Sequence, residues 1–218
     1  PVLAWRNAVL FPSTIFPITI GREKSLQLIE DAQNENSFIA AIPQLDVTVE
    51  DPVQREDLAA FGTVAKIMKT FDMPDGTVSA VLQGIARVRL EELTAIEPYL
   101  RGHVVVEQEK SVDSSDKSAR MIAESLKEKA AVILKSSSFT PKEAVTAIRS
   151  IDDFTFLVNF IATTIELDSF GEKLDLMYHA DMKERGMALL SALDNQVELL
   201  KIKQEINQKV KSDIDQQQ

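Results

Sequence analysis

Residue types that commonly perform chemistry are scarce in this sequence. Its 218 residues include no cysteine, which excludes disulfides, thiol catalysis and cysteine-ligated metals. The two histidines, His103 and His179, stand far apart in the chain, and a lone histidine is more often packed or solvated than a metal ligand. We find neither a Gly-Lys-Ser/Thr phosphate loop nor a serine in a nucleophile motif. Asp152 and Asp153 are adjacent carboxylates, but aspartate at this kind of position more often caps a helix.

We therefore predict no catalytic residue, no metal site and no cofactor site in this chain. Apolar residues beside a predicted turn indicate a candidate binding surface instead. Met68, Phe71 and Met73 flank Pro74-Asp75-Gly76-Thr77, a sequence typical of a surface hairpin turn. Soft apolar side chains at such a tip suit contact with many different polypeptides. The alternative is that the three residues pack into a core beneath the hairpin.

The charge balance argues against a nucleic-acid platform. The chain carries 24 basic and 34 acidic residues, for a formal net charge of −10. Phosphate-backbone binding relies on clustered lysine and arginine, so we predict no nucleic-acid partner. Apolar runs stay below the ~18 residues that a membrane helix needs, and the N-terminus does not resemble a signal peptide. We expect no membrane partner and a cytoplasmic location.

The first part of the chain, residues 1–107, predicts a small β-barrel with one or more helices. Arg6–Ser13 is expected to be a strand edge broken at Pro12, and Ile15–Ile20 the strand after it. A helix is expected over residues 22–35, where apolar residues recur at spacings of three. Arg87 and Arg89 alternate with apolar residues and are expected on the outer face of a strand. Further strands are expected at 37–42, 61–69, 78–83, 84–90 and 99–107.

The second part is helical to its end. Residues 108–117 are polar and read as a linker, so we predict two folding units, 1–107 and 118–218. Helix starts are indicated by Asp152 or Asp153 and by two capping boxes, Thr140–Glu143 and Ser169–Glu172. A final helix from Asp181 has no stop signal, and ~35 residues span ~50 Å. The fold class is therefore α+β, a barrel followed by an all-α bundle that ends in a long projecting helix.

Several motifs in fixed order resemble the N-terminal region of Lon proteases. Ser13 stands where that family commonly has glycine, which predicts that the turn after Pro12 does not need positive φ. The resemblance covers about the first hundred and the last eighty residues, and is poor over 108–138. The matching residues are Arg6-Asn7, Leu10-Phe11-Pro12, Phe16-Pro17-Ile18, Gly21–Ser25, Gly62–Ile67, Pro74–Thr77, Gly84 with Arg87 and Arg89, Ile151-Asp152-Asp153 and Leu189–Lys211.

This resemblance implies a PUA-like barrel and a role in recognising unfolded or degron-bearing polypeptides. It also implies substrate contacts near Arg22, Glu23 and Lys24, although these residues could equally be a solvated first helical turn. In the family, an ATPase that uses ATP and Mg and a Ser-Lys protease follow this region, and the protein assembles as a hexamer. The chain itself is then a non-catalytic part of an ATP-dependent endopeptidase.

Two other functions remain open at this stage. PUA-like barrels can bind RNA, although the acidic balance counts against that function here. A free-standing Lon-domain adaptor is the other alternative, although the long charged final helix looks unfinished for such a protein.

We predict that the purified chain neither hydrolyses ATP nor cleaves peptides, because it lacks a phosphate loop and a nucleophile motif. Phosphate release and cleavage of a fluorogenic peptide should both stay at the buffer rate. Turnover that disappears when one of the chain's own serines is replaced would contradict this prediction.

Overall fold

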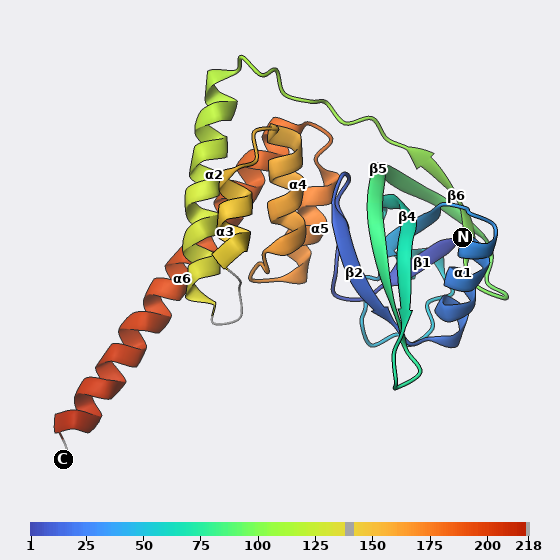
Figure 1. Ribbon diagram of the computed structural model, residues 1–218, viewed down its shortest axis with the longest axis horizontal. Coiled ribbons are helices and arrows are strands. Elements are labelled where there is room, and N and C mark those ends of the chain that lie inside the picture. Colours follow the sequence, from blue (N-terminus) through green and yellow to red (C-terminus); the bar gives the residue numbers. More distant parts are fainter. Residues whose placement is uncertain (138–141, 217–218) are drawn as a thin grey trace.

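The computed structural model describes residues 1–137 and 142–216. Figure 1 shows a β-barrel beside a bundle of helices, with the final helix projecting away from both. This arrangement confirms the predicted α+β class with its long last helix. The strands are β1 (Val2–Trp5), β2 (Ile15–Ile20), β3 (Ile39–Pro43), β4 (Phe61–Asp72), β5 (Val78–Ala95) and β6 (Arg101–Val106).

The strands form one curved sheet that nearly closes on itself. Its order is β1-β3-β4-β5-β2, and β6 also pairs with β5. β5 is one strand of 18 residues, where the sequence predicted two, and its two halves pair with β2 and β6 on the same side. The amide of Val2 donates to the carbonyl oxygen of Leu100 at 2.9 Å, which joins β1 to the segment before β6. Every buried backbone group needs such a partner, and this contact brings the sheet close to a barrel.

Helix α1 (Glu23–Asn34) covers the side of the barrel away from the bundle (Figure 1). Its buried residues are Leu28, Ile29 and Ala32, whose spacing places them on one face. They pack with Ile18 and Leu82 of the sheet in one apolar cluster. The predicted helix over 22–35 is confirmed.

The segment between β1 and β2 is a loop, so the expected strand edge at Arg6–Ser13 is wrong. Asn7 has φ 53° and Ser13 has φ 64°, and the prediction that Ser13 needs no positive φ is wrong too. The two turns let neighbouring side chains point in opposite directions. Leu10 enters the barrel core, whereas Phe11, which is fully buried, enters the helical core.

The helical part contains α2 to α6, with caps that the sequence largely predicts. The Asp153 carboxylate accepts from the amide of Phe156 at 2.7 Å, and Ser169 and Glu172 form a capping box. The expected box at Thr140–Glu143 lies partly outside the described residues. Among the helices that the structure describes, we find none long and apolar enough to cross a membrane. The helices are α2 (Lys117–Ser136), α3 (Lys142–Arg149), α4 (Phe154–Thr164), α5 (Phe170–Tyr178) and α6 (Met182–Gln216).

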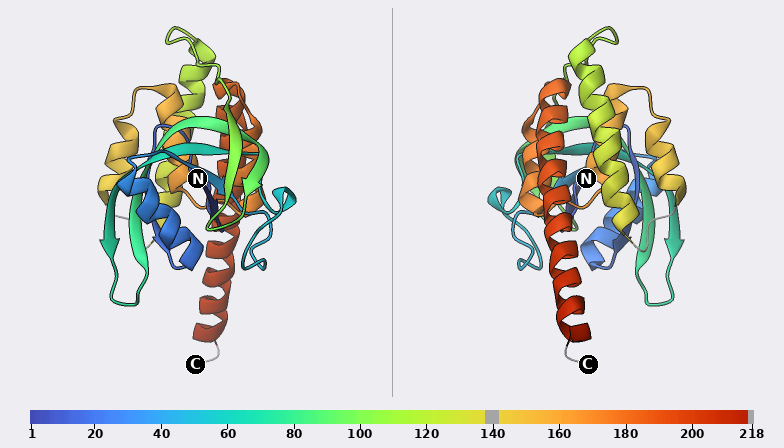
Figure 2. Two further views of the ribbon diagram at one scale, coloured as in Figure 1. Left: turned by 90° about the vertical axis from the view of Figure 1, so that its right-hand side faces the viewer. Right: turned by 90° about the vertical axis from the view of Figure 1, so that its left-hand side faces the viewer.

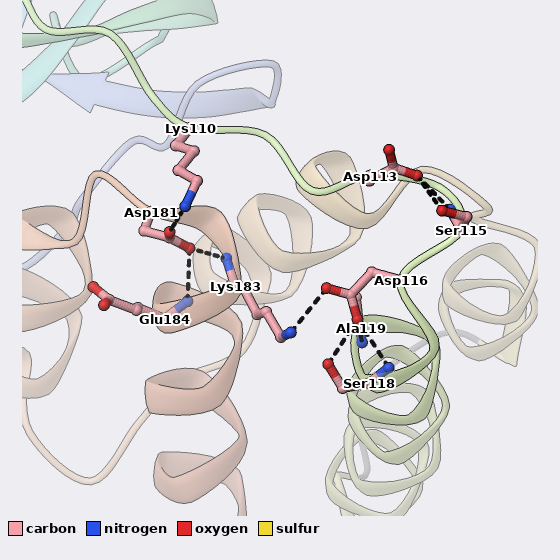
Figure 3. A network of polar contacts seen from close by, with 9 residues as sticks. All are labelled: Lys110, Asp113, Ser115, Asp116, Ser118, Ala119, Asp181, Lys183 and Glu184. Carbon is pink, nitrogen blue, oxygen red and sulfur yellow. Dashed lines mark hydrogen bonds and ion pairs between the residues drawn. The ribbon is translucent and has the colours of Figure 1, made fainter.

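The connection between β6 and α2 is irregular apart from a turn at residues 114–115, and it is joined to the start of α6 by hydrogen bonds. Lys117, the last residue of the predicted linker, is the first residue of α2. The amide of Lys110 donates to the carbonyl of Ala180 at 2.8 Å, and the amide of Met182 donates to the carbonyl of Lys110 at 3.0 Å. Figure 3 shows the side chains that reinforce this contact, with Lys110 paired to Asp181 at 3.1 Å. The predicted linker therefore runs along the bundle and is hydrogen-bonded to it.

Asp116 ties the starts of two helices together. Its carboxylate accepts from the amides of Ser118 and Ala119 in α2 and from the Lys183 ammonium of α6 at 2.8 Å (Figure 3). These contacts favour the ionised form, and Lys183 contributes most. They hold the pKa of Asp116 well below its usual range.

Two arginines hold the barrel against the bundle. Arg87 of β5 donates to the carbonyl oxygens of Met177 at 2.7 Å and Tyr178 at 3.2 Å. Its guanidinium lies 3.9 Å from the ring centroid of Phe61, and its side chain is 3% exposed. Arg87 was expected on the outer face of a strand, and that face of β5 is covered by the end of α5, so Arg87 is buried.

Arg185 of α6 completes this contact from the helical side and is fully buried. It donates to the carbonyl oxygens of Leu176 at 3.1 Å and His179 at 2.7 Å, and to Asn159 Oδ1 at 2.8 Å. Glu109 of the connection supplies its counter-charge at 2.5 Å. The two guanidiniums thus converge on the end of α5.

The final helix α6 is packed in its first half and bare in its second. Leu189 and Leu193 are fully buried in the bundle. The later apolar residues are half exposed, with Ile202 at 53% and Val210 at 52%. Both views of Figure 2 show this distal half running free of the rest of the molecule.

The Asp116 contacts predict a dependence of stability on pH. Because the folded pKa lies below the unfolded value of ~3.9, the stabilisation is full above ~3.9 and is lost as the pH falls towards the folded pKa. Asp116→Asn keeps a residue that caps helices well but removes the charge. The variant should have a lower free energy of unfolding near neutral pH, and its difference from the unmodified protein should shrink below about pH 5.

Urea unfolding at a series of pH values measures this difference. Asp113→Asn is the matched control, since the Asp113 carboxylate accepts hydrogen bonds from the nearby Ser115 and, unlike that of Asp116, has no lysine partner among the described residues. Its variant should show a smaller deficit. A deficit for Asp116→Asn that stays constant down to about pH 2 would contradict the assignment.

The exposure of the distal part of α6 predicts fast amide exchange there. An isolated helix without a buried face is marginal in water, so residues 201–214 should exchange quickly in a dilute sample. Amides around Leu189 and Leu193 should exchange slowly, because opening them disrupts the bundle core. Hydrogen exchange followed by mass spectrometry separates the two segments, and equal protection at monomeric concentration would show this prediction to be wrong.

Candidate functional site

A groove of about 450 Å³ lies at the start of α1. Sites for ligands commonly have volumes of roughly 300–1,000 Å³. All three residues of the predicted contact at the helix start, Arg22, Glu23 and Lys24, line it. The remaining lining residues come from β1 and the residue after it, from α1, from the loop after β3 and from the segment before β6: Val2, Ala4, Arg6, Ser25, Leu28, Glu50, Asp51, Pro52, Tyr99 and Leu100.

Lys24 closes one side of the groove through two ion pairs. Its ammonium lies 2.8 Å from Glu97 and 3.0 Å from Asp51. The hydrogen bond to Glu97, followed by the one to Asp51, raises the pKa of Lys24. Lys24 therefore joins α1 to two loops, and its charge is already matched by carboxylates.

Arg22 is held differently, by a neutral group. Its Nη2 donates to Oε1 of Gln44 at 2.9 Å. Gln44 is fully buried, and its amide nitrogen donates to the carbonyls of Asp46 at 2.6 Å and Val49 at 2.5 Å. Partial burial lowers the pKa of Arg22, and the neighbouring positive charge of Arg6 lowers it further.

Arg6 stands at the same groove, just after β1. Its Nη2 donates to the carbonyl oxygens of Val49 and Glu50, each at 3.2 Å. A second hollow of about 340 Å³ adjoins the groove and shares Ala4, Arg6, Arg22 and Ser25 with it. This second hollow lies between β1 and the end of β2, so the two arginines stand where the hollows meet.

The hairpin residues form a separate surface. Met68, Phe71 and Met73 are 52%, 46% and 44% exposed, so the alternative of core packing does not hold for them. The Lys69 ammonium lies 4.8 Å from the centroid of the Phe71 ring. None of the three hairpin residues lines the groove at α1, and the structure therefore presents two distinct candidate surfaces.

The histidines contribute to neither surface. His103 Nδ1 lies 3.0 Å from Glu92 on the outside of the sheet. His179 lies at the end of α5, and its carbonyl oxygen accepts from Arg185. Within residues 1–137 and 142–216 we find no group of three or more histidine, aspartate or glutamate side chains that could hold a metal ion.

Comparison with known families accounts for both the barrel and the helices. Residues 1–195 match the family described as the ATP-dependent protease La (LON) substrate-binding domain. The chain belongs to this Lon substrate-binding family. The match includes residues 108–138, where the motifs that we recognised in the sequence were sparse.

Curated relatives of this Lon domain align along its whole length. It is 38% identical over 218 residues to the Lon protease of Flavobacterium johnsoniae and covers 26% of that protein. It is 36% identical to the Lon protease of Cytophaga hutchinsonii, again over 218 residues, and covers 27% of it. The chain thus spans about a quarter of the length of these relatives.

Two solved structures share the fold of this Lon domain. The N-terminal domain of the Mycobacterium avium complex Lon protease has a TM-score of 0.68 at 18% identity, covering 89% of this chain and 97% of the other. The Lon N-terminal domain protein from Xanthomonas campestris has a TM-score of 0.61 at 19% identity, covering 88% and 96%. Both comparisons confirm a Lon N-terminal fold for this chain.

Sequence reasoning missed the partners that shape the groove of this Lon domain. Arg6 was noted only as part of a motif and Gln44 lay outside every predicted strand and helix, yet both fix the groove. The usable signal for Gln44 was its position directly after the buried strand β3. Its bond to Arg22 spans 22 positions in the chain, which no local pattern reveals.

Proposed function

We propose that this chain recognises polypeptide substrates for an ATP-dependent Lon serine protease. Unfolded or degron-bearing polypeptides are the proposed ligands. In the whole protein, an AAA+ motor that uses ATP and Mg and a Ser-Lys protease would act on what this region captures. We further propose a cytoplasmic hexamer as the assembly in which it works.

The observation that carries this proposal is the exposed apolar surface at the β4–β5 hairpin. Three large side chains project beside a turn that extends beyond the barrel (Figure 1). Apolar groups at an open tip can contact many sequences, since they select for little besides hydrophobicity. An unfolded ligand loses conformational entropy on binding, and such contacts are therefore weak individually.

Membership of the substrate-binding family supports the same role. Neither that match nor the curated relatives favours the RNA-binding alternative or the free-standing adaptor. The negative net charge of the chain also argues against RNA binding, because an acidic surface repels phosphates.

Replacing Phe71 and Met73 together by serine should weaken the binding of an unfolded model protein. If the pair supplies about 1–2 kcal/mol, Kd should rise roughly 5- to 30-fold. The melting temperature should change little, because both side chains are nearly half exposed already. Fluorescence anisotropy with a labelled, permanently unfolded protein measures the binding.

The matched control is the double change Met121→Ser and Met187→Ser. These methionines are 73% and 58% exposed on the helices, so the control removes at least as much exposed apolar surface elsewhere. Equal loss of binding in both double variants would mean that the hairpin is not a special surface. Unchanged binding in the hairpin variant would place the contact on another part of the chain.

A further inference from the structure

The two arginines at the α1 groove differ from their neighbour Lys24 in their charged contacts. Among the residues that the structure describes, neither Arg6 nor Arg22 takes part in an ion pair. Nearby Lys24, in contrast, has two carboxylates within 3.0 Å. Two guanidiniums therefore stand close together at one point of the groove. Burial and repulsion from Arg6 lower the pKa of Arg22, while the nearby carboxylates of Asp51 and Glu50 act in the opposite direction.

Both guanidiniums are held in place by neutral acceptors. Gln44 accepts one N–H of Arg22, and the carbonyls of Val49 and Glu50 accept from a single nitrogen of Arg6. Each guanidinium has five N–H donors, so several remain available for a ligand. Because Gln44 is itself buried and bonded to the loop, Arg22 loses little freedom when it binds.

The groove around the arginines selects against large polyanions. Glu23, Glu50 and Asp51 line it, and they would repel a chain of phosphates more strongly than a single carboxylate. Leu28, together with several other apolar residues of the lining, gives the floor an apolar character. A single negative group attached to an uncharged, partly apolar chain fits this combination, with its charge at the arginines and its apolar part on the floor.

We propose that Arg6 and Arg22 bind a carboxylate of an extended polypeptide lying in the α1 groove. The carboxylate can be the C-terminus of the polypeptide or the side chain of an aspartate or glutamate. Arginine pairs bind carboxylates through short, charge-assisted and often bidentate hydrogen bonds. The first turn of α1 adds a favourable dipole, since Arg22 stands at its N-cap position and provides no side-chain cap.

This site deepens the proposed function and rests on it, because the ligand is a polypeptide. The groove would supply selectivity for a chemical group, whereas the hairpin selects for apolar character alone. A recognition region that reads both features distinguishes exposed carboxylate-bearing segments from other apolar segments.

The test uses one short, unstructured, uncharged peptide labelled at its N-terminus and made in three forms. The first has a free C-terminal carboxylate, the second a C-terminal amide, and the third an amide with one internal glutamate. Anisotropy titrations of the chain should give tighter binding for at least one carboxylate form than for the neutral amide. The preference should be about tenfold, in line with charge-assisted hydrogen bonds at a partly buried site, and should weaken as salt is raised.

Arg6→Gln combined with Arg22→Gln should abolish this preference and leave binding of the neutral amide unchanged. Arg120→Gln is the matched control, because Arg120 is an exposed arginine on α2 whose side chain bonds only to the Ser114 carbonyl. Circular dichroism and the melting temperature check that the double variant is folded. If that variant is unfolded, Gln44→Met provides a second route, since it removes the acceptor that positions Arg22.

Three outcomes would overturn the proposal. They are equal affinity for all three peptide forms, a carboxylate preference that survives in the folded arginine variant, and displacement of the carboxylate peptide by short polyphosphate but not by free peptide acids. Which carboxylate form binds more tightly identifies the source of the group.

The result separates from that of the hairpin experiment. Phe71→Ser with Met73→Ser should weaken all three peptide forms about equally and keep the preference between them. If the hairpin variant loses the carboxylate preference while its binding of the neutral amide is unchanged, that result counts against the groove. If neither the hairpin variant nor the arginine variant weakens binding of any peptide form, that result counts against the proposed function itself.

Discussion

The relative position of barrel and bundle depends on two buried guanidiniums at the end of α5. The last carbonyls of a helix have no partner within the helix and carry the negative end of its dipole. Arg87 from the barrel and Arg185 from α6 occupy four consecutive carbonyls there, those of residues 176–179. One helix end is thereby bound from two domains at once, and Glu109 on the connection balances the charge.

Burying such charges is expensive, and this cost explains their geometry. A buried ion pair rarely gains much stability over apolar packing, but breaking one leaves an uncompensated charge. Arg185 meets this demand with three acceptors besides Glu109, and Arg87 meets it with two carbonyls and the face of Phe61. Shifting the barrel against the bundle would take the donors of Arg87 away from their carbonyl acceptors on α5, whereas three of the acceptors of Arg185 lie within the helical part itself. The Arg87 contact therefore fixes how the barrel is oriented against the bundle. The Leu10-Phe11 loop reinforces it by placing one side chain in each core.

Whether a feature of the fold or the site could be predicted from the sequence depends on how far apart in the chain the interacting residues lie. The caps at Asp153 and Ser169, the hairpin turn and its exposed apolar residues were predictable because their signals lie within a few positions. The continuation of β5 through Gly84 as a single strand was not predictable. Gly84 is needed because the loop at Phe11 comes close to the backbone there: an added Cβ would lie 2.5 Å from the Phe11 carbonyl oxygen. Burial of Arg87 and the Arg22–Gln44 contact also join distant segments, and alternation along a strand cannot show which face another domain covers.

The 35-residue α6 starts three residues before Arg185 and ends far from the barrel. Its root is therefore fixed close to the contact that fixes the barrel, and its first half is held in the bundle through Leu189 and Leu193. The apolar residues of the second half, Ile202, Ile206, Val210 and Ile214, recur every four residues and are each about half exposed, so they form a stripe along one side of the helix. A partner that packs on this stripe would order the distal turns in a direction that the root has already set, and its own position relative to the barrel would then be set as well.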